Sequence, residues 1–257
     1  MNVETDKVRV TRDGAILVVT INRPERRNAI DRETSVALAG AFDLLDRDDA
    51  LSIGILTGAG DHFCAGMDLK AFVAGERVEL PGRGLAGLTE RAPEKPLIAA
   101  VEGYALAGGF EIALACDLIV ASEAANFGLP EAKRGLIAGS GGLVRLPERM
   151  PRQIAMECAL TGRMIPAAEA ERWGLANRLC APGEVLETAR TLAAEIARNA
   201  PMSLIASKQI IANAGRWPED SLWPRQNEIL ERVITSQDAR EGAAAFAEKR
   251  PPVWTGR

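Results

Sequence analysis

Two glutamates in similar local settings are the residues best suited to chemistry. Glu111 follows the glycine pair Gly108-Gly109, and Glu131 follows the turn Gly128-Leu129-Pro130, twenty positions further along the chain. Two carboxylates that face one substrate can divide acid and base work when their environments favour different protonation states. Two glutamates twenty residues apart are also common on protein surfaces, so this spacing alone does not establish a site.

The glycine pair lies at a predicted junction between a strand and a helix. The apolar run Leu97 to Val101 precedes it, and the helix-forming run Phe110 to Ala115 follows it. The first N–H groups of a helix have no intrahelical partner and lie at the positive end of the helix dipole. Amides at this junction can therefore stabilise a developing negative charge, although close packing of the helix explains the glycines equally well.

Three further features of the sequence do not indicate a functional site. The motif G-x-G-x-x-G at residues 82–87 has no strand before it, and Pro93 and Pro96 follow it, so a dinucleotide site is disfavoured. The segment Gly139-Ser140-Gly141-Gly142 lacks the lysine of a P-loop and fits close helix packing. His62 is the only histidine, so a catalytic triad would depend on it, and no cluster has metal-ligand spacing.

The elements that must position these residues alternate between strand and helix in the first half of the chain. A turn signal at Arg12-Asp13-Gly14 predicts an opening hairpin, and Asp31 can cap the helix that follows. The recurrence of strand, loop and helix start predicts βα turns stacked in a spiral rather than one open sheet. Further elements are expected as a strand at 53–57, a short helix at 69–74, and strands at 97–101 and 118–121.

The last part of the chain is predicted to be helical. Prolines and Asp238 separate apolar segments with helical spacing. A helical tail after an α/β body either covers that body or reaches another subunit. The expected helices are 184–199, 202–214, 219–236 and 239–249.

Length and composition describe an ordinary globular protein. The chain has 257 residues, 47% of them hydrophobic and 26% charged, and its formal net charge is −4. A negative net charge lacks the excess of basic residues that is typical of nucleic-acid-binding proteins. No apolar run approaches the roughly 20 residues that a membrane-spanning helix needs. No nucleic-acid partner and no membrane partner are expected. No secretory signal is visible at the N-terminus, so we expect a cytoplasmic protein.

Three blocks of sequence together resemble the enoyl-CoA hydratase (crotonase) family. The similarity extends from Asn22-Arg23-Pro24 and Asn28-Ala29 to the C-terminal segment 245–254. Within the family, this ending and the segment 66–71 look most like carnitinyl-CoA dehydratase and its hydratase relatives. The three blocks are Phe63-Cys64-Ala65-Gly66-Met67-Asp68-Leu69-Lys70, then 95–105 with Gly108-Gly109-Phe110-Glu111 and Asp117, then Phe127-Gly128-Leu129-Pro130-Glu131 with Gly135 and Gly141-Gly142.

The resemblance implies an α/β fold of two parts. Residues 1–195 form a crotonase-like spiral of ββα repeats that holds the active site, and residues 196–257 form a helical C-terminal trimerisation region. The chain is accordingly expected to form a homotrimer, or a homohexamer made of two trimers. The partner is an acyl-CoA substrate; coenzyme A is part of that substrate, so no separate cofactor and no metal are expected.

The family's functional residues carry over by position. By this resemblance, the backbone N–H groups of Met67 and Gly108 are expected to form the oxyanion hole, and Glu111 and Glu131 are expected to be the catalytic pair. Met67 is larger than the alanine common at its position, and Ala107 stands where many relatives have another glycine. The predicted substrate contacts are Arg26, Arg27, Ala29, Ala65, Asp68, Leu69 and Lys70, with Phe246 and Lys249 reaching the nucleotide end from this subunit or a neighbouring one.

The activity implied by the resemblance is that of an enoyl-CoA hydratase. Such an enzyme adds water reversibly, in syn fashion, to a 2-enoyl-CoA thioester and gives a 3-hydroxyacyl-CoA. The alternatives are carnitinyl-CoA dehydratase, enoyl-CoA isomerase and a non-catalytic acyl-CoA-binding scaffold. An isomerase needs one carboxylate, so the presence of Glu111 and Glu131 favours water chemistry and argues against a scaffold. Acyl length, head group and product stereochemistry are left open.

Overall fold

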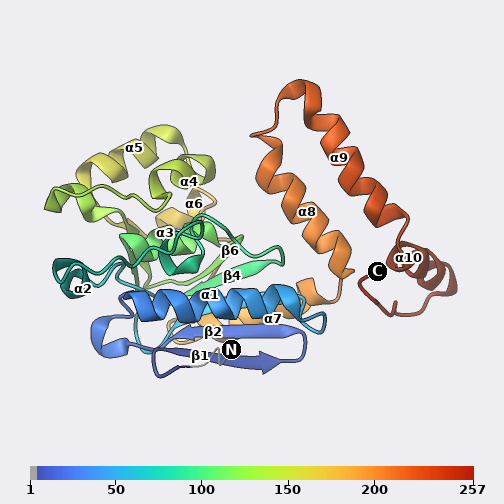
Figure 1. The fold of residues 1–257 in the computed structure, drawn as a ribbon, viewed down its shortest axis with the longest axis horizontal. Helices are drawn as coiled ribbons and strands as arrows, with labels where there is room; N and C mark the ends of the chain where they lie inside the picture. Colours follow the sequence, from blue (N-terminus) through green and yellow to red (C-terminus); the bar gives the residue numbers. More distant parts are fainter. Residues whose placement is uncertain (1–4) are drawn as a thin grey trace.

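A six-stranded sheet forms the centre of the computed structural model, which describes residues 5–257 (Figure 1). Strands β1 and β2 pair antiparallel, and all other neighbours in this sheet are parallel. The predicted hairpin is confirmed: Asp13 lies opposite Ile16, and Gly14 takes a φ of +56° in the turn. In spatial order the strands are β1 (Val8–Asp13), β2 (Ile16–Ile21), β3 (Ile53–Gly58), β4 (Leu97–Val101), β6 (Leu118–Ser122) and β9 (Arg178–Cys180).

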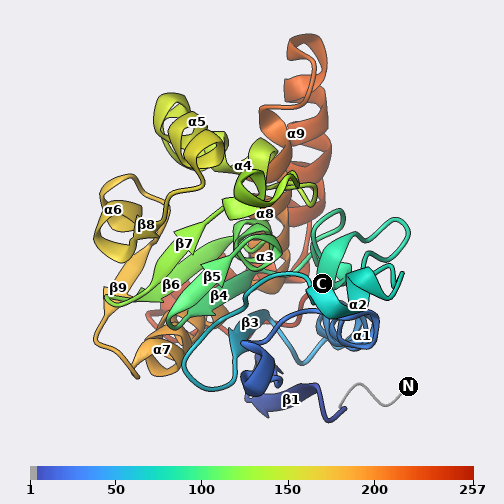
Figure 2. The ribbon, with the colours of Figure 1, turned by 90° about the vertical axis from the view of Figure 1, so that its left-hand side faces the viewer.

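A second, three-stranded sheet is formed by β5 (Tyr104–Leu106), β7 (Asn126–Gly128) and β8 (Ile165–Pro166) (Figure 2). The chain passes from β4 through β5 into helix α3 (Gly108–Ala115), and from β6 through β7 into the short 3-10 helix η3 (Pro130–Arg134). Two successive strand-strand-helix units therefore stack side by side, which confirms the predicted spiral of ββα repeats.

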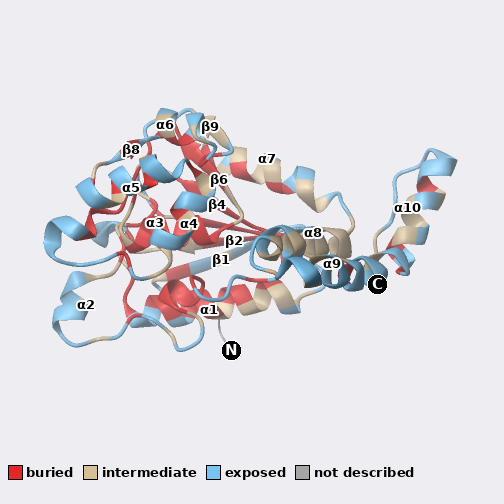
Figure 3. Ribbon diagram, turned by 90° about the horizontal axis from the view of Figure 1, so that it is seen from above, coloured by how far each residue is buried: buried red, intermediate tan, exposed pale blue. Residues whose placement is uncertain are grey.

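Helices cover both faces of the large sheet. Because side chains alternate along a strand, Ile16 and Val18 of β2 belong to one core and Leu17 and Val19 to the other. Helix α7 (Val185–Ala197) packs on the first face, and α1 (Arg32–Arg47) and α3 belong to the core of the second. Figure 3 shows buried residues concentrated where these layers meet.

Local capping explains where several helices begin. The side chain of Asp31 accepts a hydrogen bond from Thr34 N at 2.9 Å and caps α1, as predicted. Helix α3 begins at Gly108, two residues before the predicted start. The amide of Gly108 is therefore a first-turn amide of the helix.

The elements between Glu131 and residue 183 were not predicted, because they are short and one of them contains Pro147. The two strands among them, β8 and β9, complete the edges of the small and the large sheet, and the helices contribute buried side chains to the core. They are α4 (Gly142–Arg149), α5 (Arg152–Thr161), β8, α6 (Ala167–Arg172) and β9; the other short helices are η1 (Pro24–Arg26), α2 (Leu69–Val73) and η2 (Leu85–Gly87).

Three helices extend away from the sheets at the C-terminal end (Figure 1): α8 (Pro201–Ala214), α9 (Glu219–Ile234) and α10 (Gln237–Glu248). Lys208 of α8 connects this arm to the core through an ion pair with Asp117 at 2.7 Å. The predicted division between residues 195 and 196 falls in the last turn of α7, and it stays a prediction. None of the helices within residues 5–257 combines the length and the hydropathy that crossing a bilayer requires.

Candidate active site

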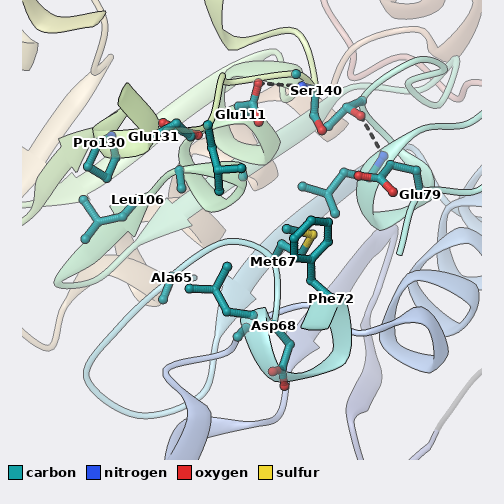
Figure 4. Close-up of a pocket in the computed structure, with 18 of the residues that line it drawn as sticks. Ala65, Met67, Asp68, Phe72, Glu79, Leu106, Glu111, Pro130, Glu131 and Ser140 are labelled. Atoms are coloured by element: carbon teal, nitrogen blue, oxygen red, sulfur yellow. Dashed lines mark hydrogen bonds between the residues drawn. The ribbon is translucent and has the colours of Figure 1, made fainter. Parts of the chain in front are cut away.

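One cavity of about 540 Å³ gathers most of the predicted site residues (Figure 4). Phe246 and Lys249 are not part of its wall. They lie in α10 and at its C-terminal cap, on the opposite side of the molecule from α2 in Figure 1. Their predicted contact with the nucleotide end therefore needs a second copy of the chain, and it stays a prediction. The predicted residues in the wall are Arg26, Arg27, Ala29, Ala65, Met67, Asp68, Leu69, Lys70, Gly108, Glu111 and Glu131.

The small sheet brings the two glutamates together. Strands β5 and β7 are parallel, with Leu106 paired to Gly128 at their carboxyl ends. The chain leaves both strands on the same edge and enters a helix directly, so Glu111 in α3 and Glu131 in η3 both face the cavity (Figure 4). A twenty-residue separation in sequence thus becomes proximity across one pair of strands.

Glu111 is anchored by backbone amides at the start of α4. Its Oε1 accepts hydrogen bonds from Ser140 N at 2.7 Å and Gly142 N at 2.8 Å. Gly141, between these donors, has a φ of +98° that a residue with a side chain rarely adopts. Within residues 5–257, Oε2 of Glu111 accepts no hydrogen bond, so this oxygen is available to a ligand. Burial raises the pKa of Glu111 above its usual 4.5, against the opposite influence of the two amides.

Glu131 has a different environment. Its side chain is buried, and its Oε2 finds no hydrogen-bond partner in the described part of the chain. Burial raises the pKa of Glu131 above 4.5, and the negative charge of Glu111 acts in the same direction. An unpartnered buried oxygen of this kind can exchange a proton or a hydrogen bond with a water or a substrate.

Two free amides adjoin the carboxylates. Hydrogen bonds from Ile30 N to Gly66 O and from Asp68 N to Ile30 O hold the backbone on each side of Met67. A Cβ added to Gly108 would stand 3.5 Å from Met67 N, so the two segments are in direct contact. Among residues 5–257, no acceptor takes the N–H of Met67 or of Gly108. Two such donors can hold one oxygen that gains negative charge.

The turn before α3 is conformationally strained. Ala107, the N-cap residue, has a φ of +52° and a ψ of −129°, a region that residues other than glycine rarely occupy. Its N–H bonds to Gly128 O at 2.9 Å, which ties the turn to β7. Facing it, Gly66 has a φ of +95°, and a Cβ there would stand 2.9 Å from Gly108 N. Both conformations present the amide of Gly108 to the cavity.

Asp68 has a structural role that the sequence did not indicate. Its carboxylate caps α2, accepting from Lys70 N at 3.0 Å, and pairs with Arg23 at 3.0 Å. Arg23 also lies 3.1 Å from Asp31, the cap of α1. Although burial acts to raise the pKa of Asp68, these bonds lower it below the usual 3.8. Asp68 therefore fixes the geometry of the Met67 segment while it lines the cavity.

The mouth of the cavity is basic. Arg26 and Arg27 are exposed and form no ion pair with any residue from 5 to 257. The left-handed conformations of Arg27 (φ 50°) and Asn28 (φ 56°) shape this turn, and the buried Asn28 side chain donates to Ala59 O at 2.9 Å. Two unpaired guanidinium groups at a cavity mouth suit the phosphate groups of a ligand.

Sequence reasoning missed the purpose of the segment 139–142. Its glycines were attributed to close helix packing or a phosphate nest, whereas its amides hold the Glu111 carboxylate. The available signal was a glycine-rich segment before a helix start, which exposes amides that a buried carboxylate can satisfy. Thr89 and Arg145, which bond to each other near this segment, gave no signal in the sequence.

The chain is similar over nearly its whole length to known proteins. The profile of the family described as "Enoyl-CoA hydratase/isomerase" matches residues 11–257. The structure of enoyl-CoA hydratase from Mycobacterium tuberculosis H37Rv is 56% identical, with a TM-score of 0.97 over 98% of this chain and 100% of that one.

Relatives with a different name are also similar over the whole chain. Carnitinyl-CoA dehydratase of Salmonella typhi is 45% identical over 262 residues, covering 98% of this chain and 100% of that protein. The structure of carnitinyl-CoA hydratase from Mycobacterium avium is 45% identical, with a TM-score of 0.79 over 99% of this chain and 100% of that one.

Proposed function

Because the chain belongs to the enoyl-CoA hydratase/isomerase family, we propose that it is an enoyl-CoA hydratase, a hydro-lyase that adds water reversibly to a 2-enoyl-CoA thioester. The observation that supports this most is the meeting of Glu111 and Glu131 with two free amides in one cavity. The product is a 3-hydroxyacyl-CoA, formed by syn addition.

The chemistry follows from where charge develops. Attack of water at Cβ of the conjugated thioester moves electron density onto the thioester oxygen. The N–H groups of Met67 and Gly108 hold that oxygen, a contribution of about 3–4 kcal/mol for one such donor. Since its Oε1 is anchored, Glu111 orients the water and accepts its proton through Oε2. Glu131 delivers a proton to Cα, and the roles reverse in dehydration.

The coenzyme A part of the substrate lies toward the basic mouth. Arg26 and Arg27 contact its phosphates, and Ala29, Ala65, Leu69 and Lys70 line its path, with Asp68 beneath. Phe246 and Lys249 of a neighbouring subunit complete the nucleotide end. This arrangement accounts for two exposed arginines that form no ion pair within residues 5–257, and for the large apolar side chain of Phe246, which is 88% exposed.

A homotrimer, or a hexamer made of two trimers, is part of the same proposal. The arm α8–α10 carries exposed apolar side chains, including Ile211 and Trp223, at 81% and 64% exposure. Exposed apolar surface on an arm that leaves the core favours burial against other copies. This burial brings α10 of one copy toward the cavity mouth of the next.

A second candidate substrate is favoured by two carboxylates in the cavity wall. Glu79 and Glu90 line the cavity, are exposed, and form no ion pair with any residue from 5 to 257. Two uncompensated carboxylates suit an acyl group that ends in a cation. Crotonobetainyl-CoA, the substrate for hydration to carnitinyl-CoA, has such a trimethylammonium group, and relatives named for carnitinyl-CoA are 45% identical.

The test compares two unsaturated thioesters by the loss of absorbance of the conjugated bond. We expect crotonyl-CoA to be hydrated by the wild-type enzyme. A higher kcat/KM for crotonobetainyl-CoA, lost in Glu79→Gln, assigns the cationic substrate instead. If no unsaturated thioester loses absorbance while coenzyme A binds measurably, hydratase function is refuted and a non-catalytic scaffold is supported.

A further inference from the structure

Arg145 links two segments of the chain that both line the cavity. It lies in the first turns of α4, and its Nη1 donates to Ser140 O at 3.3 Å while its Nη2 donates to Thr89 O. Ser140 belongs to the segment whose amides hold Glu111, and Thr89 belongs to a different segment that also lines the cavity. One guanidinium thus bridges carbonyls from segments more than fifty residues apart in the sequence.

The segment that contains Thr89 also contacts the proposed oxyanion site. Thr89 is buried, and its Oγ1 accepts a hydrogen bond from Leu85 N at 2.9 Å. A Cβ added to Gly108 would stand 2.5 Å from Cδ2 of Leu85, so Leu85 packs directly on the residue whose amide faces the substrate. The contacts of Arg145 therefore extend in one direction to Glu111 and in the other to Gly108.

The bridge depends on a planar, two-pronged donor. Nη1 of Arg145 lies 2.1 Å from the place that a Cβ on Gly141 would occupy, so the guanidinium packs closely against the backbone of the segment that holds Glu111. Arg145 is half-buried and forms no ion pair with any residue in 5–257. A desolvated arginine without a carboxylate partner is costly, which argues against a role in stability alone.

We infer that Arg145 is a positioning residue of the hydration reaction: by clamping Ser140 to Thr89 it fixes the direction in which Glu111 presents Oε2 to the water. This inference rests on the proposed function of Glu111. Among the described residues, only the amides of Ser140 and Gly142 hold Glu111 Oε1, so a shift of Ser140 would rotate the carboxylate. A displacement of about 1 Å at a reacting group is enough to reduce a rate by about 10²-fold.

The charge of Arg145 has a second, separable effect on the same carboxylate. The charges of Arg145 and Glu79 act on the pKa of Glu111, and the charge of Glu111 acts on that of Glu131. The other charges that act on Arg145 are those of Arg149, Arg216 and Glu148. The positive charge of Arg145 lowers the pKa of Glu111 against the effect of burial. Removing it should move the acid limb of the kcat profile to higher pH.

The experiment compares Arg145→Met and Arg145→Lys with Arg149→Met, a matched control on the same helix whose guanidinium donates to Cys116 O instead. For Arg145→Met we expect kcat for crotonyl-CoA to fall about 10- to 100-fold with KM within about threefold, and the acid limb to rise. Arg145→Lys keeps the charge but cannot bridge two carbonyls, so it should restore the acid limb without restoring the rate. Arg149→Met should leave both unchanged.

A double-mutant cycle distinguishes positioning from general damage. If Arg145 acts through Glu111, Arg145→Met should cause little further loss in a Glu111→Gln background. The inference is overturned if folded Arg145→Met or Arg145→Lys has the kcat and pH profile of the wild type. It is also overturned if Arg149→Met loses as much kcat as Arg145→Met.

A readout without turnover separates this inference from the proposed function. The Glu111 carboxyl is titrated by ¹³C NMR and assigned with Glu111→Gln. A wild-type protein that hydrates no substrate refutes the proposed function and the positioning role that rests on it, but it leaves the effect of Arg145 on the titration of Glu111 open to this measurement. An unchanged Glu111 titration in Arg145→Met refutes the electrostatic part of the present inference, whether or not the protein turns over.

Discussion

Glu111 and Glu131 are the same residue type in unlike surroundings. Oε1 of Glu111 is fixed by two amides at 2.7 and 2.8 Å, whereas Oε2 of Glu131 is buried without a partner among the described residues. A fixed carboxylate suits the orientation of a water, and an unpartnered one suits a proton that must be handed over. Since the two charges interact, the pair should titrate as a coupled unit.

The first prediction concerns turnover. Replacing either acid by its amide removes a proton-transfer group but keeps its volume. Glu131→Gln and Glu111→Gln should each lower kcat for crotonyl-CoA by about 10²-fold or more, while the Kd for 3-hydroxybutyryl-CoA stays within about threefold. Steady-state kinetics and calorimetric titration measure the two quantities. Near-normal turnover in either variant removes that acid from the mechanism.

The second prediction concerns stability and pH. The folded-state pKa of Glu131 is raised, so its favourable contribution is fully present below its ordinary pKa of 4.5 and is lost as pH rises through the raised value. At pH 7, which lies above the ordinary pKa, folding therefore costs free energy at this group, whether the carboxyl ionises or keeps its proton. Glu131→Gln should raise the free energy of unfolding at pH 7 by about 1 kcal/mol, or Tm by about 2–4 °C, and this gain should vanish near pH 4.

Differential scanning calorimetry at both pH values measures this effect. Glu123→Gln, a change at an exposed glutamate outside the cavity wall, is the control and should leave Tm unchanged at both. A gain that persists at pH 4 would show that the effect does not come from the raised pKa of Glu131.

Among the secondary-structure elements, short strands and turns with unusual backbone conformations position the groups of the site. Three-residue strands β5 and β7 align the two acids, and positive φ values at Gly66 and Ala107 aim the amide of Gly108. The third prediction is that Gly66→Ala lowers kcat by about 10-fold or more, because its Cβ would stand 2.9 Å from Gly108 N and displace an oxyanion donor.

Gly183→Ala is the matched control for this change. Gly183 has a φ of +86°, close to that of Gly66, but a Cβ there would meet nothing within 4 Å. Both variants should lose stability from backbone strain, measured by thermal unfolding, and only Gly66→Ala should lose kcat. Equal kcat values in the two variants would remove the amide of Gly108 from the oxyanion site.

The sequence predicts an element well when residues close together in the chain specify it, and poorly when contacts between distant segments do. Hydrophobic runs and turn residues located β4, the hairpin before Ile16 and helix α1, because a strand, a two-residue turn and an Asp cap are each specified by neighbouring residues. The anchoring of Glu111 by Ser140 and the bridge from Arg145 to Thr89 join distant segments. Such contacts exist only after folding, so no local pattern encodes them.

For the whole molecule, the proposed site would extend beyond one copy of the chain. The cavity wall contains all the predicted site residues except the two on the C-terminal arm, Phe246 and Lys249. The wall was predicted through the family resemblance, since contiguous motifs carry over position by position. The predicted contact of Phe246 and Lys249 would cross from one copy of the chain to another, so the fold of a single chain does not test it.

The fourth prediction tests the contribution of the arm. If Lys249 of a neighbouring copy contacts the nucleotide end of the substrate, Lys249→Ala should raise KM for crotonyl-CoA about 10-fold and leave kcat unchanged, since a charge-assisted hydrogen bond contributes about 1.5–3 kcal/mol. Light scattering is the control, and both proteins should contain three or six copies of the 27.4 kDa chain. An unchanged KM in an intact oligomer excludes this contact.

The most direct test of the central claim is a crystal structure with acetoacetyl-CoA, whose enolate form has the charge that develops during hydration. We expect its thioester oxygen at about 2.7–3.1 Å from both Met67 N and Gly108 N, with Cα and Cβ beside the carboxylates of Glu131 and Glu111. A thioester oxygen that contacts neither amide, or a Cβ outside the reach of both carboxylates, contradicts it.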